Sequence, residues 1–173
     1  MDAPVSCTLQ DMLAARDRRC ERQRLHFQST PEATLVVATV VAPGEHKLCR
    51  ASQVVAQAMA SALREEFGPC ITGFERHDYV SGPELWLTLS CTPVEAKRTA
   101  VRIEDTHRLG RLFDIDVIQP DLRPMSRADL SLPPRRCLLC DREARLCMRM
   151  HQHTADEIRQ FIEKLIHDYA DAQ

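Results

Sequence analysis

The chain has 173 residues, of which 44% are hydrophobic and 28% charged, and its formal net charge is −2. This length fits one ordinary domain that buries roughly 70% of the surface exposed by the unfolded chain, so stability needs no disulfide framework. A slightly acidic chain argues against a broad electrostatic footprint on nucleic acid, and any phosphate site must therefore be local.

Eight cysteines would be typical of a small secreted protein, but the first residues show no basic stretch followed by an apolar core. The longest apolar runs are far shorter than the ~20 residues of a membrane-spanning helix. We therefore expect a reduced, cytoplasmic protein that does not enter a membrane, with cysteines that are buried thiols or metal ligands.

Helical and strand patterns alternate along the chain, as judged from apolar spacing, capping residues and turn residues. In chain order we predict a helix over 8–28, a strand over 35–42, a helix over 51–67, strands over 71–76 and 84–91, a helix over 92–105, a strand over 109–117, and a final helix from 154. Residues 119–137 are predicted to be loop with one short strand, and the arginines of the first helix to form a solvated face. This order predicts an α+β fold, with a mixed central sheet flanked by helices.

Two carboxylates in the predicted strand 109–117 are the first candidate for chemistry. Side chains alternate along a strand, so Asp114 and Asp116 point one way while the apolar residues between and beside them point the other. Two acids on one face can grip a divalent cation such as Mg²⁺. Because the pair follows Gly110, it is typical of a nucleotidyltransferase-like site for a triphosphate, although a plain solvent-facing strand has the same pattern.

Arginines surround this acid pair in the sequence. Residues 108–149 contain nine arginines against six acids, and the planar guanidinium makes paired, charge-assisted hydrogen bonds to phosphate. Arg111, Arg135 and Arg136 are favoured as phosphate ligands because they lie near the acid pair or cluster together. The alternative is a composition bias, because the chain uses 20 arginines and only 3 lysines.

A second candidate site is Cys137-x2-Cys140-x6-Cys147, which is followed by His151 and His153. A Cys-x2-Cys pair fits two thiolates around one tetrahedral zinc, and Cys147 with either histidine would complete a closed structural Cys3His site. The alternative is three reduced cysteines without a metal.

Several of these motifs together resemble the citrate lyase holo-acyl-carrier-protein synthase family, the apo-citrate lyase phosphoribosyl-dephospho-CoA transferases. The resemblance lies in Leu-Gly-Arg-Leu-Phe-Asp-Ile-Asp-Val at 109–117, Ser-Arg at 126–127, Ser-Leu-Pro-Pro-Arg-Arg-Cys-Leu-Leu-Cys at 131–140, Thr-Val-Val-Ala-Pro-Gly at 39–44, and the arginine-rich first helix. It covers most of the chain, which we treat as a single transferase domain over 1–173 with a possible zinc segment at 137–153 and a C-terminal helix at 154–173.

This resemblance implies an enzyme that transfers the 2'-(5''-triphosphoribosyl)-3'-dephospho-CoA precursor to a serine of the apo acyl carrier subunit of citrate lyase and releases pyrophosphate. Asp114 and Asp116 would then be the catalytic pair that holds Mg²⁺, and His153 would be the fourth zinc ligand. The residues assigned to substrate phosphates are Arg111, Lys47, Arg135, Arg136, Gly110 and Arg127.

The base that takes the serine proton stays open in the sequence. One of the two aspartates, a third carboxylate such as Asp129 or Glu104, or metal coordination alone could serve, whereas His107 at a helix end is expected to cap carbonyls. The competing hypothesis is a non-enzymatic, zinc-stabilised module that binds nucleic acid or a protein partner.

Overall fold

The computed structural model describes residues 5–172, and the chain forms two compact units that divide between Met125 and Ser126. The first unit contains a four-stranded sheet of β1 (Thr34–Val40), β2 (Ile71–Tyr79), β3 (Gly82–Leu89) and β4 (Phe113–Ile118), in the order β2-β3-β1-β4. Its helices are α1 (Leu9–Ser29), α2 (Arg50–Phe67) and α3 (Pro93–Thr106), with short 3-10 turns η1 (Gly68–Cys70) and η2 (Gly110–Leu112). The predicted α+β class is confirmed for this unit.

The predicted mixed sheet is wrong, because every pair of neighbouring strands is antiparallel. The crossover through α2 joins β1 to β2, with β3 inserted between them, and the crossover through α3 joins β3 to β4, with β1 inserted. Each crossover therefore connects strands that run in the same direction but do not touch. This is the split βαβ arrangement, in which sequence alternation does not produce parallel neighbours.

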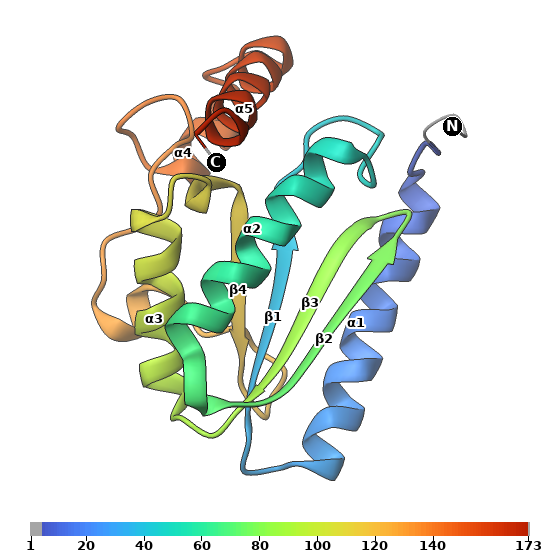
Figure 1. Cartoon of the computed structure of the whole chain (residues 1–173), viewed down its shortest axis with the longest axis vertical. Coiled ribbons are helices and arrows are strands. Elements are labelled where there is room, and N and C mark those ends of the chain that lie inside the picture. The colour runs from blue at the N-terminus through green and yellow to red at the C-terminus, as the bar shows by residue number, and fades with distance from the viewer. Residues whose placement is uncertain (1–4, 173) are drawn as a thin grey trace. The chain divides into compact units, whose positions relative to one another are not determined.

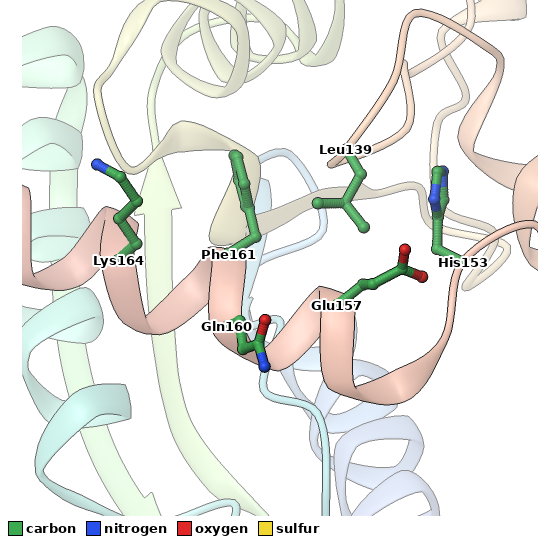
Figure 2. Close-up of a pocket in the computed structure, with 6 residues that line it drawn as sticks. All are labelled: Leu139, His153, Glu157, Gln160, Phe161 and Lys164. Atoms are coloured by element: carbon green, nitrogen blue, oxygen red, sulfur yellow. The ribbon is translucent and has the colours of Figure 1, made fainter.

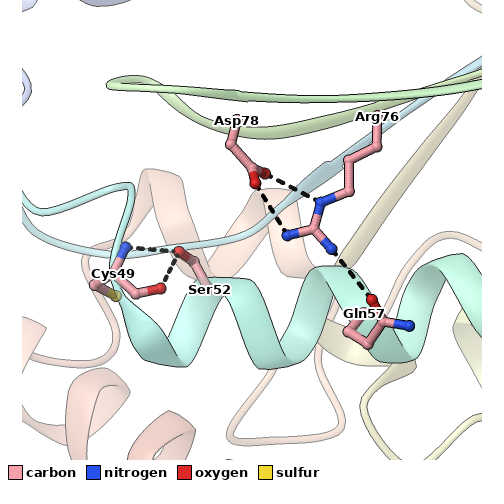
Figure 3. Close-up of polar contacts among 5 residues, drawn as sticks. All are labelled: Cys49, Ser52, Gln57, Arg76 and Asp78. Carbon is pink, nitrogen blue, oxygen red and sulfur yellow. Dashed lines mark hydrogen bonds and ion pairs between the residues drawn. The ribbon is translucent and has the colours of Figure 1, made fainter.

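Helices α2 and α3 pack on one face of this sheet (Figure 1). Apolar side chains of β4, β1 and β3 meet them there, and Phe113, Ile115 and Leu87 are fully buried. At the β2 edge, Arg76 bonds to Asp78 on its own strand and to the Gln57 side chain of α2 (Figure 3). In the first turn of α2, the Cys49 N–H donates to Ser52 Oγ over 3.0 Å.

Helix α1 lies on the opposite face of the sheet. Its Phe27 packs against the apolar cluster of Leu35, Val37, Trp86 and Ile118, which belong to β1, β3 and β4. The helix begins after Thr8, whose hydroxyl accepts from the Asp11 N–H, as the predicted N-cap requires.

The outer edge of β4 is closed by side chains of α3. The Ile115 N–H donates to a Glu104 oxygen over 3.1 Å, and the Lys97 ammonium donates to the Ile115 carbonyl over 3.4 Å. Both α3 side chains are buried. They satisfy backbone groups that an edge strand would otherwise leave unpaired.

The second unit contains η3 (Ala128–Leu130), α4 (Ala144–Arg149) and α5 (Ala155–Ala170). Helix α4 was not predicted, whereas the final helix begins after Thr154 with the expected capping box. The short strand predicted within 119–137 is wrong. Only isolated bridges occur there, Ile118 to Pro124 and Arg136 to Glu143, because prolines at four positions in the segment lack the N–H that a ladder needs. Within the described residues, no helix is long and apolar enough to cross a membrane.

Candidate functional site

The acid pair lies on β4 as the two-residue period predicts. Asp114 is exposed and Asp116 is half-buried, whereas Phe113, Ile115 and Val117 are buried on the opposite face. The pair therefore belongs to the face of the sheet on which α1 also packs. Across the strand boundary, Asp114 lies beside Thr39 and Asp116 beside Val37 of β1.

Gly110 turns the chain from α3 into β4. It is buried, and a Cβ atom built on it would lie 2.5 Å from the Ile103 carbonyl oxygen and 2.6 Å from the Glu104 carbonyl oxygen. Only glycine permits this approach of η2 to the last turns of α3. Packing thus accounts for the glycine, and its predicted contact with phosphate stays a prediction. Arg111 follows it in the same turn, half-buried.

His107 and Glu104 lie just before this turn. His107 ends α3, where its backbone N–H donates to the Ile103 carbonyl and its Nδ1 accepts from the Leu109 N–H, each over 3.0 Å. Burial, followed by the nearby Arg108 charge, lowers the pKa of His107. Glu104 is buried and accepts from the Ile115 N–H. This candidate base therefore holds the edge of β4 through a backbone hydrogen bond.

Lys47 comes from the loop that follows β1. The Val41 N–H donates to the Leu112 carbonyl over 2.9 Å, which ties the start of this loop to η2. The Lys47 ammonium is half-buried and donates to the Ala42 carbonyl in the same loop. The structure therefore brings the Lys47 loop to the end of the sheet where η2 and β4 begin.

The arginines of α1 do not all form the solvated face that we predicted. Arg16 and Arg24 are exposed and pair with Asp17 and Glu21 on their own helix. By contrast, three arginines on the turns that face the sheet are partly buried, and they are Arg18, Arg19 and Arg22. The prediction of a solvated arginine face is wrong for these three residues because side chains of the sheet, both acidic and aromatic, contact their guanidinium groups.

That acid is Glu84 of β3, whose side chain is only 2% exposed. One of its oxygens is 2.9 Å from Arg19 Nη1 and 3.3 Å from Arg18 Nη2, and the other accepts from the Trp86 indole N–H over 3.3 Å. The Arg18 guanidinium also lies 3.7 Å from the Tyr79 ring centre. Sequence reasoning missed this group, and the only available signal was an acid on the buried strand 84–91.

The Cys/His cluster forms within the second unit. The ligand atoms of Cys137, Cys140, Cys147 and His153 all lie within 4.8 Å of one another, and no other group of three or more candidate ligand residues is found among residues 5–172. Cys140 Sγ is 3.5 Å from Cys147 Sγ and 3.4 Å from His153 Nε2. His153 rather than His151 completes the set, which settles the alternative that the spacing left open. All eight cysteines of the chain are free thiols.

The backbone of this cluster favours one thiolate. Burial opposes ionisation of Cys137, but backbone N–H groups of Leu139 and Cys140, with the neighbouring thiols, bring its pKa down to about 7. Burial and the same neighbouring thiols raise the pKa of Cys147 to about 12. The Cys-x2-Cys turn itself therefore stabilises a thiolate at Cys137, whereas ionisation of Cys147 beside it needs a further positive charge.

Three predicted phosphate ligands belong to this second unit. Arg127 precedes η3, and Arg135 and Arg136 lie on the arm that leads into Cys137. The Ala144 N–H donates to the Arg135 carbonyl over 2.8 Å, and Arg136 pairs with Asp141 over 3.3 Å. The cysteine turn therefore joins the arm that carries Arg135 and Arg136 to the arm that carries Asp141 and Ala144. Lys47, Gly110, Arg111 and the acid pair belong to the first unit.

A hollow of about 430 Å³ adjoins the Cys/His cluster (Figure 2). Leu139, from between the first two cysteines, and the candidate metal ligand His153 line it on one side. Residues of α5 line the other side, and they are Glu157, Gln160, Phe161 and Lys164. Except for His153, the sequence analysis did not single out these residues for a site.

Comparison with known proteins matches this chain over nearly its whole length. A family model described as apo-citrate lyase phosphoribosyl-dephospho-CoA transferase matches residues 7–169. A protein of that name from Escherichia coli O9:H4 (strain HS) is 35% identical over 166 residues, which cover 93% of this chain and 89% of the relative. One from Shigella boydii serotype 18 is 34% identical over the same shares. The chain therefore belongs to the apo-citrate lyase phosphoribosyl-dephospho-CoA transferase family.

Proposed function

We propose that this protein transfers the 2'-(5''-triphosphoribosyl)-3'-dephospho-CoA precursor to a serine of the apo acyl carrier subunit of citrate lyase. The observation that carries the proposal is the shared face of Asp114 and Asp116, which lies inside the segment that matches the transferase family. The competing hypothesis of a non-enzymatic module gives no role to this acid pair.

The reaction exchanges one phosphorus–oxygen bond for another. The carrier serine Oγ attacks the phosphorus that is attached to the ribose, and a phosphodiester forms. The bond from that phosphorus to the next phosphate breaks, so pyrophosphate leaves with its electron pair, while the serine proton passes to a base. Such transfers depend on positioning and charge stabilisation, so no nucleophile of this chain is required.

The acid pair suits a hard divalent cation. Two carboxylates offer only oxygen ligands, as Mg²⁺ prefers, and both are accessible on the surface of β4. Mg²⁺ bound there would neutralise charge on the triphosphate and on the leaving pyrophosphate. Arg111, which follows Gly110 directly before β4, and Lys47 would hold substrate phosphates from the same end of the sheet. Arg127, Arg135 and Arg136 lie on the second unit, and their contact with phosphate stays a prediction.

The serine proton would go to whichever oxygen of Asp114 or Asp116 is not engaged by the cation. Glu104 is buried against the Ile115 N–H, and Asp129 accepts from the Ser126 N–H over 2.8 Å, so both of these carboxylates already serve the backbone.

The Cys/His cluster would hold Zn²⁺ in a structural role. A tetrahedral site with Zn–S bonds of about 2.3 Å has sulfur–sulfur edges of roughly 3.8 Å, close to the observed 3.5 Å between Cys140 and Cys147. Three thiolates and one imidazole close the coordination shell, so the metal would fix the fold of the second unit and take no part in the transfer.

The proposal is tested by incubating the protein with apo acyl carrier subunit, the triphosphate precursor and Mg²⁺. We expect the carrier to gain the mass of the phosphoribosyl-dephospho-CoA group, one pyrophosphate to appear for each modified carrier, and a carrier with its serine replaced by alanine to gain nothing. An unmodified carrier under these conditions would contradict the proposed function.

A further inference from the structure

We propose that Arg18 and Arg19 of α1 bind the polyphosphate of the substrate, and that the buried Glu84 is the positioning residue that holds them for this task. The triphosphate ligand rests on the proposed function, whereas the arginine group itself rests on contacts within the first unit. None of these residues was among the phosphate ligands predicted from the sequence.

The group carries an uncompensated positive charge. In the part of the chain that the structure describes, Glu84 is the one carboxylate that Arg18 and Arg19 contact, so these two guanidinium cations share a single anion. Their side chains stay 38% and 25% exposed, in contrast to the 2% of Glu84. The acid is thus buried beneath its partners while the cations stay accessible, as a site for an incoming anion requires.

The neighbours of the two arginines fix their direction. Glu84 is itself held by the Trp86 N–H, and the Tyr79 ring supports the Arg18 guanidinium from one side. Arg22, one turn further along α1, lies 4.3 Å from the Trp86 ring centre and pairs with Glu75 over 2.8 Å. A rigid carboxylate and stacked rings restrict the arginine rotamers, which lowers the entropy lost when a phosphate binds.

Two buried polar atoms at this end of the sheet lack partners. Among the described residues, Arg18 Nε and Ser81 Oγ are buried without a hydrogen bond. Ser81 lies in the turn between β2 and β3, next to Tyr79 and Gly82. A Cβ built on Gly82 would lie 3.5 Å from the Lys47 carbonyl, so the turn adjoins the loop that carries the predicted phosphate ligand Lys47. These two buried atoms therefore mark hydrogen-bonding capacity that is left unused beside the arginine group and in the β2–β3 turn.

The register places this group within reach of the acid pair. Thr39 of β1 lies beside Asp114 on one side and beside Glu84 on the other, so all three belong to one row across the same face of the sheet. Cross-strand neighbours are about 5 Å apart, which puts Asp114 and Glu84 about 10 Å apart at their backbones. A triphosphate whose metal ion is held at Asp114 can extend along this row toward Arg19.

The test begins with binding of inorganic triphosphate in the presence of Mg²⁺, measured by titration calorimetry on the full chain. We expect Arg19→Ala and Arg18→Ala each to weaken binding at least 10-fold, and Arg19→Lys to retain part of the affinity. The matched controls are Arg16→Ala and Arg24→Ala, which remove exposed arginines of the same helix and should leave the affinity unchanged. An equal loss of triphosphate affinity in these controls would mean that the effect comes from the net charge of the helix, and it would overturn the proposal.

Steady-state transfer then separates binding from folding. We expect Arg19→Ala and Glu84→Gln to raise KM for the triphosphate precursor at least 10-fold while KM for the carrier stays unchanged, with melting temperatures recorded for every variant. If the wild-type chain transfers but Arg19→Ala changes neither KM nor triphosphate affinity, the inference is wrong and the proposed function stands. If triphosphate binding depends on Arg19 but no transfer occurs, the proposed function fails instead.

Discussion

Asp114 and Asp116 lie on the face of β4 opposite its buried apolar side chains, so replacing both carboxylates leaves the apolar packing of the strand in place. Asparagine keeps the shape of each side chain but lowers its affinity for a hard cation. We expect the double variant Asp114→Asn/Asp116→Asn to fold and to lose at least ~100-fold in kcat, as is typical when charge stabilisation is removed. Activity and thermal unfolding should be measured on the same preparations.

Asp78→Asn provides the control for that experiment. Asp78 is an exposed strand aspartate of β2 that bonds to Arg76 on the face where α2 packs, away from the acid pair. It should keep wild-type kcat. Full activity in the double asparagine variant would show that the acid pair does not hold a catalytic metal.

Gly110 is where a predicted ligand and a packing constraint coincide. Because a Cβ atom would come within 2.5 Å of a carbonyl oxygen of α3, Gly110→Ala must shift backbone, and we expect a loss of about 1–3 kcal/mol in unfolding free energy. Urea denaturation measures this loss. Gly73→Ala is the comparison: its nearest neighbour at 3.2 Å is a Thr88 side-chain atom, which can move, so its loss should be smaller. A normally stable Gly110→Ala protein that only loses substrate binding would favour the phosphate role instead.

At the scale of whole elements, the sequence predicted local structure well and strand neighbours poorly. The helix starts at Thr8, Thr92 and Thr154 were correct because each cap is decided within four residues. The antiparallel order was not predictable in the same way, because it depends on each crossover skipping a strand. The closure of the β4 edge by Lys97 and Glu104 likewise needs the packed structure.

The capping box of α3 gives a prediction with a defined pH dependence. Hydrogen bonds from the Thr92 hydroxyl and N–H lower the pKa of Glu95, so this contribution to stability is present above the ordinary pKa of glutamate and is lost as the pH falls through the lowered value. We expect Thr92→Ala to lower the melting temperature by a few degrees at pH 7. At pH 3 the difference from wild type should shrink, and an equal difference at both pH values would contradict this account.

At the scale of the whole molecule, the limits of sequence reasoning follow from distance along the chain. The acid pair and the Cys/His set were predictable because their members lie within 17 residues of one another or closer. Glu84 and Arg19 are 65 residues apart, so no local pattern links them. Arginines on a helix look solvated until the sheet supplies a buried acid beneath them. A site whose residues come from distant elements is therefore not found by sequence motifs, even when each helix and strand that carries them is predicted.

The division of the chain into two compact units predicts how it responds to metal removal. The second unit has few fully buried apolar side chains apart from its cysteines and Ile162, whereas the first contains a large core, so a metal at the Cys/His cluster would supply much of the second unit's stability. We expect about one zinc per chain by mass spectrometry. After a strong chelator is added, amide hydrogen exchange should speed up throughout 137–170 while the amides of β1 and β3 keep their protection. Cys147→Ser should reproduce this pattern without chelator, and Cys20→Ser, at an exposed position on α1, should not. Unchanged exchange in 137–170 after complete removal of the metal would show that the second unit is stable without it.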